Sequence, residues 1–164
     1  MLNDRIHFRA FQLNDTKRLF NIYSNKDAMK YRGSKPMQSI GDALDFVKKQ
    51  VVDDKKEKII RLGIELSATD ELIGSVMFRY PKRYTDVCEI GYSIGFEYWG
   101  IGLGKEAVKL ILEKVTQDSV IRRINAWSHR DNIASIKILE SFGFEQKNQE
   151  RTKEHLLFVK RSSL

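Results

Sequence analysis

Three glycines at alternate positions, Gly100, Gly102 and Gly104, lie between a segment of alternating apolar residues and a segment of helical periodicity. Glycine has no Cβ, so the backbone of such a loop can approach a ligand and turn successive N–H groups into one concavity. A helix beginning near Leu103 adds unpaired N–H groups and the positive end of its dipole. Lys105 adds a full positive charge. The spacing therefore predicts an anion site; the alternative is a turn that only joins strand to helix.

The residues around this loop exclude two familiar nucleotide-binding motifs. A P-loop needs Ser or Thr after its Gly-Lys pair, and here Lys105 is followed by Glu106. A dinucleotide-binding fingerprint needs a further glycine where Lys105 stands. We therefore expect a different phosphorylated ligand. A branched side chain at position 102 is expected to fill the concavity that holds it.

A second group of motifs follows the loop: Asn132-Ile-Ala-Ser135 and then the segment 139–144. Together with the loop they resemble the GNAT superfamily of acyl-CoA-dependent N-acetyltransferases, and within it the branch of ribosomal-protein alanine N-acetyltransferases. The loop motif of that family, Gln/Arg-x-x-Gly-x-Gly/Ala, places Gly102 and Gly104 on its small positions, with Trp99 where Gln or Arg is commonest. The resemblance covers nearly the whole chain, through the segments 5–9, 29–31, 89–92 and 143–144.

The resemblance implies acetyl-CoA as co-substrate, without a metal, and gives each segment a role. The strand that ends near residue 94 would separate from the strand near Ile124, so that the thioester lies between them. Asn132 would hydrogen-bond the arm of the cofactor, with Ser135 beside it on the same helix face, although Asn132 is equally suited to cap that helix. Backbone groups of one set of residues would bind the pantetheine amides: Tyr92, Ser93 and Ile94. A second set would hold the diphosphate: Gly100, Ile101, Gly102, Leu103, Gly104 and Lys105.

Acetyl transfer to an amine requires a base for the ammonium proton, a donor that polarises the thioester carbonyl, and an acid for the departing thiolate. Backbone N–H groups of the separated strand can polarise the carbonyl. Glu89, expected near the centre of the sheet, is the first candidate base and Glu65 the second. Each is equally well explained as a solvent-facing or ion-paired glutamate. Ser135 is the candidate acid, because Leu139 stands where many members of the family have a tyrosine. Trp127 stands where some members have a glutamate.

The transfer can be direct, from thioester to amine, so it needs no covalent enzyme intermediate. Cys88, on an expected strand, is predicted to be a packed apolar residue and not a nucleophile. The acceptor side is expected to include Arg32 and the segment Met29–Tyr31. The amine can belong to a protein N-terminus, an aminoglycoside or a small metabolite, although the net positive charge of the chain disfavours polycations.

Hydrophobic periodicity predicts the elements that must position these residues. Strands are expected over residues 6–11, 60–66, 72–80, 87–94, 121–128, 144–149 and 156–160. Helices are expected after a cap at Asn14 or Asp15, from a Ser39–Asp42 capping box through residue 51, from about 103 to 115, and over 132–142 with Gly143 at the end. The charged run 53–58 is expected to be a solvated turn.

The order of these elements predicts the fold class. Three consecutive strands imply an antiparallel meander, and the strand–helix–strand step from residue 87 to 128 implies a parallel pair. We therefore expect an α+β (mixed α/β) GNAT fold. Its central twisted sheet would be mixed and mostly antiparallel, with one splayed strand pair and helices on both faces.

Composition agrees with one soluble domain over residues 1–164. The chain has 29 Lys plus Arg against 22 Asp plus Glu, a formal charge of +7, with one cysteine and three scattered histidines. One cysteine allows no internal disulfide, and the spacing offers no metal site. No apolar run has the length of a signal peptide or a membrane span, so we expect a cytoplasmic protein without a membrane partner, as a monomer or homodimer.

The basic charge leaves two alternatives to an active acetyltransferase. One is a basic RNA- or ribosome-binding module, although Lys and Arg are interleaved with acids and no base-reading motif is present. Nucleic acid is therefore expected only through a ribosomal substrate. The other alternative is a GNAT-fold protein that binds acyl-CoA without turnover, because the usual tyrosine is missing.

Overall fold

A computed structural model describes residues 4–161, so the expected domain of residues 1–164 extends beyond the described residues at both ends. Besides short 3-10 turns at Leu13–Asp15 and Phe96–Tyr98, the chain forms helices α1 Thr16–Ser24, α2 Lys26–Met29, α3 Ile40–Lys48, α4 Leu103–Thr116 and α5 Ile133–Ser141. The strands are β1 Ile6–Arg9, β2 Val51–Asp53, β3 Glu57–Leu66, β4 Leu72–Pro81, β5 Val87–Ile94, β6 Arg123–His129, β7 Glu145–Thr152 and β8 His155–Arg161.

The eight strands of the described chain form one sheet in the order β1-β3-β4-β5-β6-β8-β7, with β2 paired to β3. All neighbouring pairs are antiparallel except β5 and β6, which are parallel. The predicted mixed, mostly antiparallel sheet is therefore confirmed, including the meander β3–β4–β5 and the crossover through α4.

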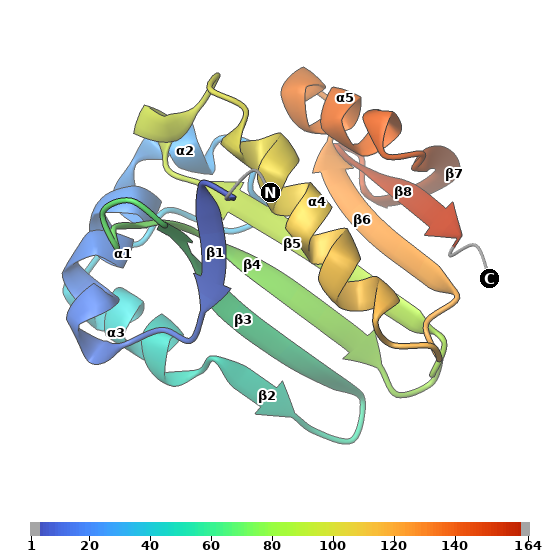
Figure 1. Ribbon diagram of the computed structural model, residues 1–164, viewed down its shortest axis with the longest axis horizontal. Coiled ribbons are helices and arrows are strands. Elements are labelled where there is room, and N and C mark those ends of the chain that lie inside the picture. Colours follow the sequence, from blue (N-terminus) through green and yellow to red (C-terminus); the bar gives the residue numbers. More distant parts are fainter. Residues whose placement is uncertain (1–3, 162–164) are drawn as a thin grey trace.

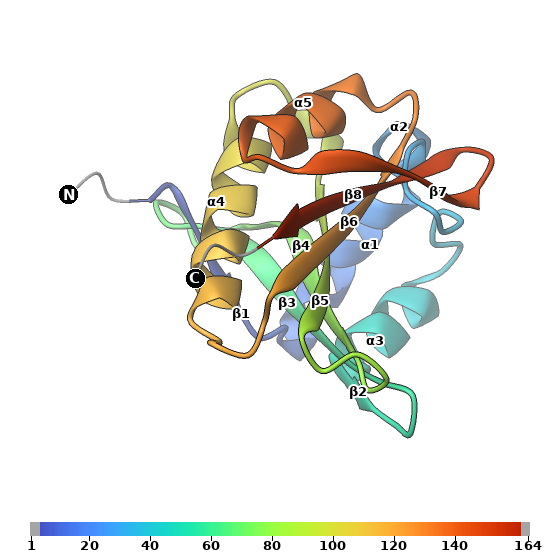
Figure 2. The ribbon, with the colours of Figure 1, turned by 90° about the vertical axis from the view of Figure 1, so that its right-hand side faces the viewer.

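Helices cover both faces of this sheet (Figures 1 and 2). Helices α4 and α5 lie on one face, and α1, α2 and α3 lie on the other. The larger core cluster packs α4 against the even-numbered residues of β5, among them Cys88 and Ile90. A second cluster packs α1 and α3 on the opposite face, around Tyr23 and Val47. The two faces of β5 therefore meet different layers.

The predicted end of the helix that starts at Ser39 is wrong. Helix α3 ends at Lys48, because Val51 pairs with Ile60 in the ladder of β2 with β3. The charged run 53–58 contains an exposed turn at residues 54–56, as predicted, and this turn closes a β-hairpin in which Asp53 and Lys58 are paired. An apolar residue that continues a helical period fits an edge strand equally well, so the sequence pattern could not separate the two.

The predicted N-caps of α3 and α5 are present in the structure, and the predicted side-chain cap of α1 is not. Ser39 and Asp42 form the predicted capping box of α3, and Asn132 caps α5 by accepting a hydrogen bond from the Ser135 N–H (3.2 Å). Asp15 stands before α1, but its carboxylate accepts hydrogen bonds from the Arg9 guanidinium (2.7 and 2.9 Å) instead of capping the helix. The same carboxylate also accepts the backbone N–H of Gln12 (2.7 Å). Its local hydrogen bond therefore stabilises the 3-10 turn before α1 and not α1 itself.

Candidate functional site

The glycine loop joins β5 to the N-terminus of α4. Gly100 and Gly102 both have left-handed backbone conformations, with φ of 78° and 87°, and Gly102 is the N-cap residue of the helix. A Cβ on Gly100 would meet no atom within 4 Å, so this side of the loop faces open space. Gly104 already lies in the first turn of α4, and Lys105 beside it is exposed. The N-terminus of α4 and the exposed Lys105 side chain therefore lie beside an accessible space, which suits a phosphate group.

Arg5, the residue before β1, holds the loop in place. Its guanidinium donates to the Ile101 carbonyl (3.0 Å) and to the Glu106 carboxylate (2.9 Å). Glu106 also accepts the backbone N–H of Arg5 (2.5 Å). A Cβ on Gly102 would lie 3.3 Å from Nη2 of Arg5. A side chain at position 102 would act by displacing Arg5.

Strands β5 and β6 separate beside this loop. Their ladder runs from Val87–Arg123 to Ile90–Ala126 and ends there, although both strands continue. Figure 1 shows the two strands side by side at their start and diverging toward α5. The predicted splayed pair is thus present, and the last residues of β5 border the gap.

The backbone groups of β5 alternate between β4 and this gap. The Gly95 N–H donates to the Ile73 carbonyl (2.7 Å), so the odd-numbered residues, Ser93 included, turn their backbone groups toward β4. Those of Tyr92 and Ile94 point to the gap, where the Trp99 indole already donates to the Ile94 carbonyl (2.8 Å). Of the three residues expected to face the cofactor, Ser93 therefore has its backbone on the other side.

Tyr92 joins the gap to α5 through its side chain. Its hydroxyl is 3.1 Å from the Ser135 Oγ, and the Ser135 N–H is held by Asn132. Burial raises the pKa of Tyr92, and the Ser135 hydrogen bond partly opposes this. The family resemblance assigned a role only to the backbone of Tyr92, in binding the pantetheine amides. Its even position, shared with Ile90 and Ile94, was the signal that its ring faces the helices.

Glu89 lies on the opposite face of the sheet. Its side chain is 12% exposed, and one carboxylate oxygen lies 3.0 Å from Arg79 and 3.4 Å from Arg151. The other oxygen accepts the Trp127 indole N–H (3.1 Å). Trp127, which stands where some family members have a glutamate, therefore orients a glutamate from the neighbouring strand. Both oxygens of Glu89 have donors, as in the ion-paired alternative.

The remaining predicted residues lie apart from the gap. Glu65 is ion-paired with Arg9, its other carboxylate oxygen lies 3.1 Å from Nε2 of His7, and β4 separates it from β5. Leu139 is buried in the core, and so is Cys88. Burial raises the pKa of the Cys88 thiol to about 12, which keeps it protonated and agrees with a packing role.

Residues on the expected acceptor side gather on the Glu89 face. The Tyr31 ring lies 5.4 Å from the His129 ring, and His129 lies 5.3 Å from His155, centroid to centroid. Arg32 stacks on the Tyr23 ring at 4.0 Å. The two histidines were not singled out by the sequence, because they are far apart along the chain and meet only through the pairing of β6 with β8.

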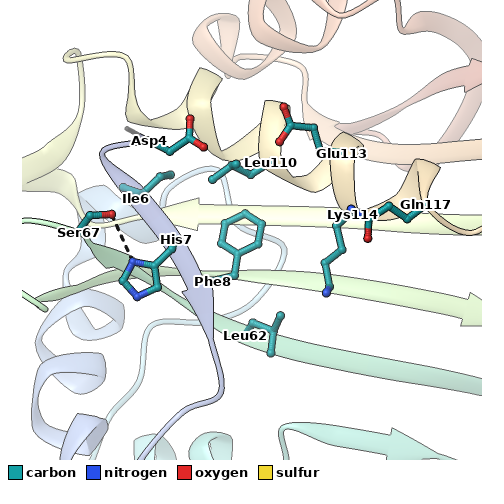
Figure 3. Close-up of a pocket in the computed structure, with 10 residues that line it drawn as sticks. All are labelled: Asp4, Ile6, His7, Phe8, Leu62, Ser67, Leu110, Glu113, Lys114 and Gln117. Carbon is teal, nitrogen blue, oxygen red and sulfur yellow. Dashed lines mark hydrogen bonds between the residues drawn. The ribbon is translucent and has the colours of Figure 1, made fainter. Parts of the chain in front are cut away.

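A depression of about 540 Å³ lies away from the loop, between β1, β3 and the C-terminal half of α4 (Figure 3). Apolar side chains of Phe8, Leu62 and Leu110 form its floor, and Asp4, Glu113 and Lys114 lie at its rim. It contains none of the residues predicted for the site.

Residues 4–161 contain neither a candidate metal site nor a helix that could span a membrane. No group of three or more His, Cys, Asp or Glu side chains there could hold a metal ion. None of the helices in that range is long and apolar enough to span a membrane.

Comparison with known proteins identifies the family. The sequence model of the family described as "Acetyltransferase (GNAT) domain" matches residues 5–145. The uncharacterized N-acetyltransferase p20 of Bacillus licheniformis is 28% identical over 170 aligned positions, which cover 100% of this chain and 94% of that protein. The uncharacterized N-acetyltransferase YoaA of Bacillus subtilis (strain 168) is 30% identical over 143 positions, which cover 87% of this chain and 81% of that protein.

Solved structures share the fold over almost the full chain. An acetyltransferase (GNAT family) from Bacillus anthracis superposes with a TM-score of 0.78 at 21% identity, covering 96% of this chain and 95% of its own. The spermidine N-acetyltransferase from Vibrio cholerae, solved with CoA and spermine, gives 0.80 at 18% identity and covers 97% and 96%. The family match, the relatives and the loop beside a splayed parallel pair agree: this chain belongs to the GNAT family of N-acetyltransferases.

Proposed function

We propose that the protein transfers an acetyl group from acetyl-CoA directly to a primary amine, within a single domain of residues 1–164. The observation that carries this proposal is the pair of left-handed glycines, Gly100 and Gly102, at the start of α4 beside the gap between β5 and β6. Backbone N–H groups of residues 100–104 and the Lys105 ammonium bind the diphosphate. The backbone groups of Tyr92 that face the gap and the Ile94 N–H bind the pantetheine arm, and Asn132 contacts it from α5.

The two proton transfers of the reaction take place on opposite faces of the sheet. The amine approaches on the Glu89 face, loses a proton and attacks the thioester carbonyl, whose oxygen is polarised by a backbone N–H of β5. The C–N bond forms, the C–S bond breaks, and the thiolate takes a proton on the other face. Ser135 supplies that proton, and Tyr92, hydrogen-bonded to Ser135, positions and replenishes it.

Glu89 is the proposed base, acting directly or through a water molecule. Arg79 and Trp127 fix its carboxylate, while the more distant Arg151 is the donor that an incoming ammonium would replace. Glu89→Gln keeps the shape and removes the base. We expect kcat to fall about 100-fold, with acetyl-CoA affinity unchanged. Equal losses in kcat and affinity would assign Glu89 a structural role.

The cofactor site is tested by comparing acetyl-CoA with acetyl-pantetheine, which lacks the diphosphate. Gly102→Ala would strain a backbone with φ of 87° and displace Arg5 from the loop. Gly143→Ala is the matched control, because its φ is 80° and its Cβ would also lie 3.3 Å from a basic side chain, that of Lys160. Both variants are expected to lose about 1 kcal/mol of stability.

Only Gly102→Ala should weaken acetyl-CoA binding, by about ten-fold as measured by calorimetry, and neither variant should change the affinity for acetyl-pantetheine. If Gly102→Ala and Gly143→Ala bind acetyl-CoA equally well, the loop does not hold the diphosphate. Binding of acetyl-CoA without thiol release on any amine would instead identify a GNAT-fold protein that lacks turnover.

The acceptor amine and the cellular location of the reaction are part of the same proposal. A protein N-terminus and a small-molecule amine are both acceptors of the proposed kind, and the cytoplasm, where acetyl-CoA is available, is the proposed location. The resemblance to the ribosomal-protein branch favours a protein N-terminus. The acceptor face offers a more specific indication.

A further inference from the structure

We propose that the amine acceptor carries an anionic group, a carboxylate or a phosphate, which is bound by Arg32, Arg61 and Arg79 on the Glu89 face of the sheet. This inference rests on the proposed function and adds the chemical class of the substrate. The three arginines come from different parts of the chain: the segment after α2, strand β3 and strand β4. We call them the arginine cluster.

Strand register places Arg61 and Arg79 on the acceptor face. Arg61 lies opposite Met77 of β4, and Met77 lies opposite Gly91 of β5. A Cβ on Gly91 would contact the Met77 side chain at 3.5 Å, so the two residues share a face. Arg79 lies opposite Glu89 and is ion-paired with it. The arginines therefore project on the side of the sheet where the amine approaches.

Aromatic rings bring Arg32 to the same place. Its guanidinium lies 4.0 Å from the centroid of the Tyr23 ring and 5.8 Å from that of Phe46. Arg61 lies over the same Phe46 ring, at 5.6 Å. Stacking on a ring orients a guanidinium and leaves its N–H edge free for a planar or tetrahedral anion.

The charges of the arginine cluster are incompletely balanced. Arg79 has carboxylate partners, Glu57 at 3.2 Å and Glu89 at 3.0 Å. Arg32 has no carboxylate partner within residues 4–161, and its buried Nη1 has no hydrogen bond there. Arg61 donates to the Lys49 carbonyl (3.3 Å). Burial and then the charges of Arg32 and Arg79 lower the pKa of Arg61. A bound anion would relieve this repulsion and satisfy the free donor of Arg32.

The distance from the arginine cluster to the gap suits a short substrate. Arg61 on β3 and Gly91 on β5 are separated by one strand, β4. Two inter-strand spacings correspond to about 10 Å between their backbones. The long arginine side chains reduce the distance that the substrate must span. An amine a few bonds away from its anionic group can therefore occupy both places. The same three positive charges disfavour a polycationic amine at this face.

Matched acceptors test the proposal through the rate of thiol release from acetyl-CoA. The peptides Ala-Asp-Asp-Ala, Ala-Asn-Asn-Ala and Ala-Lys-Lys-Ala share an N-terminal amine and differ in charge, and phosphoethanolamine with ethanolamine forms the phosphate arm. We expect kcat/KM to be about ten-fold higher for the anionic member of at least one arm than for its neutral partner. The lysine peptide should be the poorest. The arm that responds identifies the carboxylate or the phosphate.

Arginine variants then assign the preference to the arginine cluster. Arg61→Gln and Arg32→Gln should each bring the ratio of anionic to neutral kcat/KM close to one. Arg83→Gln is the control, because Arg83 also stacks on a ring, that of Tyr84 at 5.5 Å, but lies in the connection between β4 and β5. It should keep the wild-type ratio. Equal use of anionic and neutral acceptors by the wild-type protein, or an unchanged ratio in both cluster variants, would overturn the inference.

A binding measurement separates this inference from the proposed function. The N-acetylated peptide Ac-Ala-Asp-Asp-Ala and N-acetylated phosphoethanolamine accept no further acetyl group, and calorimetry in the presence of CoA measures their affinity. At least one should bind about ten-fold more weakly to Arg61→Gln than to the wild-type protein. If no amine is acetylated but this dependence on Arg61 is found, the transfer reaction is refuted and the anion site stands. If amines are acetylated and neither compound depends on Arg61, the anion site is refuted and the transfer stands.

Discussion

Glu89 and Tyr92 lie three positions apart on β5, so their side chains leave opposite faces of the sheet. Glu89 meets Arg79 and Trp127 on the acceptor face, whereas the Tyr92 hydroxyl meets Ser135 on the face of α4 and α5. The proposed base and the proposed acid therefore lie on opposite faces, which suits a reaction that takes a proton from the amine on one side and returns one to the thiolate on the other. The gap between β5 and β6 joins the two sides.

At this residue scale we predict that Tyr92 and Ser135 act as a unit. Tyr92→Phe and Ser135→Ala each remove one hydroxyl of the pair and should lower kcat about 100-fold, with acetyl-CoA affinity nearly unchanged. The double variant should lose little more than the worse single variant, because either change breaks the same path. Thiol release under saturating acetyl-CoA measures this. Fully additive losses would show that the hydroxyls act independently.

At the scale of the secondary-structure element, the start of helix α5 depends on Asn132. The Asn132 side chain accepts the Ser135 N–H and thereby sets both the start of the helix and the position of a proposed catalytic hydroxyl. Ser39 performs the same capping function for α3, far from the gap. The pair allows helix stability to be separated from site geometry.

We predict that Asn132→Ala and Ser39→Ala each lower the free energy of unfolding by about 1 kcal/mol, as measured by urea denaturation. Asn132→Ala should in addition weaken acetyl-CoA binding and lower kcat, because it releases Ser135 and removes the proposed contact to the cofactor arm. Ser39→Ala should leave both unchanged. If the two variants affect binding equally, Asn132 is a cap and nothing more.

At the scale of the whole molecule, the described residues are organised around one continuous sheet with a hydrophobic core cluster on each face. Cys88 sits at the centre of the larger cluster, between the sheet and α4, and is fully buried. Its thiol must therefore stay protonated while the fold persists. The charges of the molecule lie outside this core, and the acceptor face bears three of its positive charges in the arginine cluster.

At this scale we predict a loss of stability at alkaline pH that is due to Cys88. Burial raises the pKa of the thiol to about 12 in the folded protein, against ~8.5 in an unfolded chain. The unfolded chain thus releases this proton first, and the stability present below pH ~8.5 is progressively lost as the pH rises toward the folded pKa.

Near pH 10 the free energy of unfolding that is lost through Cys88 amounts to about 2 kcal/mol. It is measured by urea denaturation at pH 10 and at neutral pH. Cys88→Ala lowers the stability at every pH because it leaves a cavity, but it should reduce the pH dependence by that amount. Identical pH dependences of the two proteins would show that the thiol ionises as easily in the fold as outside it.

Much of the fold follows from local patterns in the chain. The alternation over residues 72–80 and 87–94, the helical period after Leu103, the Ser39–Asp42 box and Gly143 each involve residues within a few positions of one another. Their physical basis is local as well: burial of one face, a cap, or a left-handed turn. The glycine spacing likewise determined where a loop could approach an anion.

Only the tertiary structure decided which distant residues meet. Val51 continued a helical period, yet pairing with Ile60 drew it into β2, and Asp15 bonded Arg9 in place of its own helix. The contact between Tyr92 and Ser135 and the convergence of the arginine cluster depend on strand register and on helix placement across the sheet. Hydrogen-bond and charge partners of this kind come from separate elements, and no local pattern encodes the register that joins them.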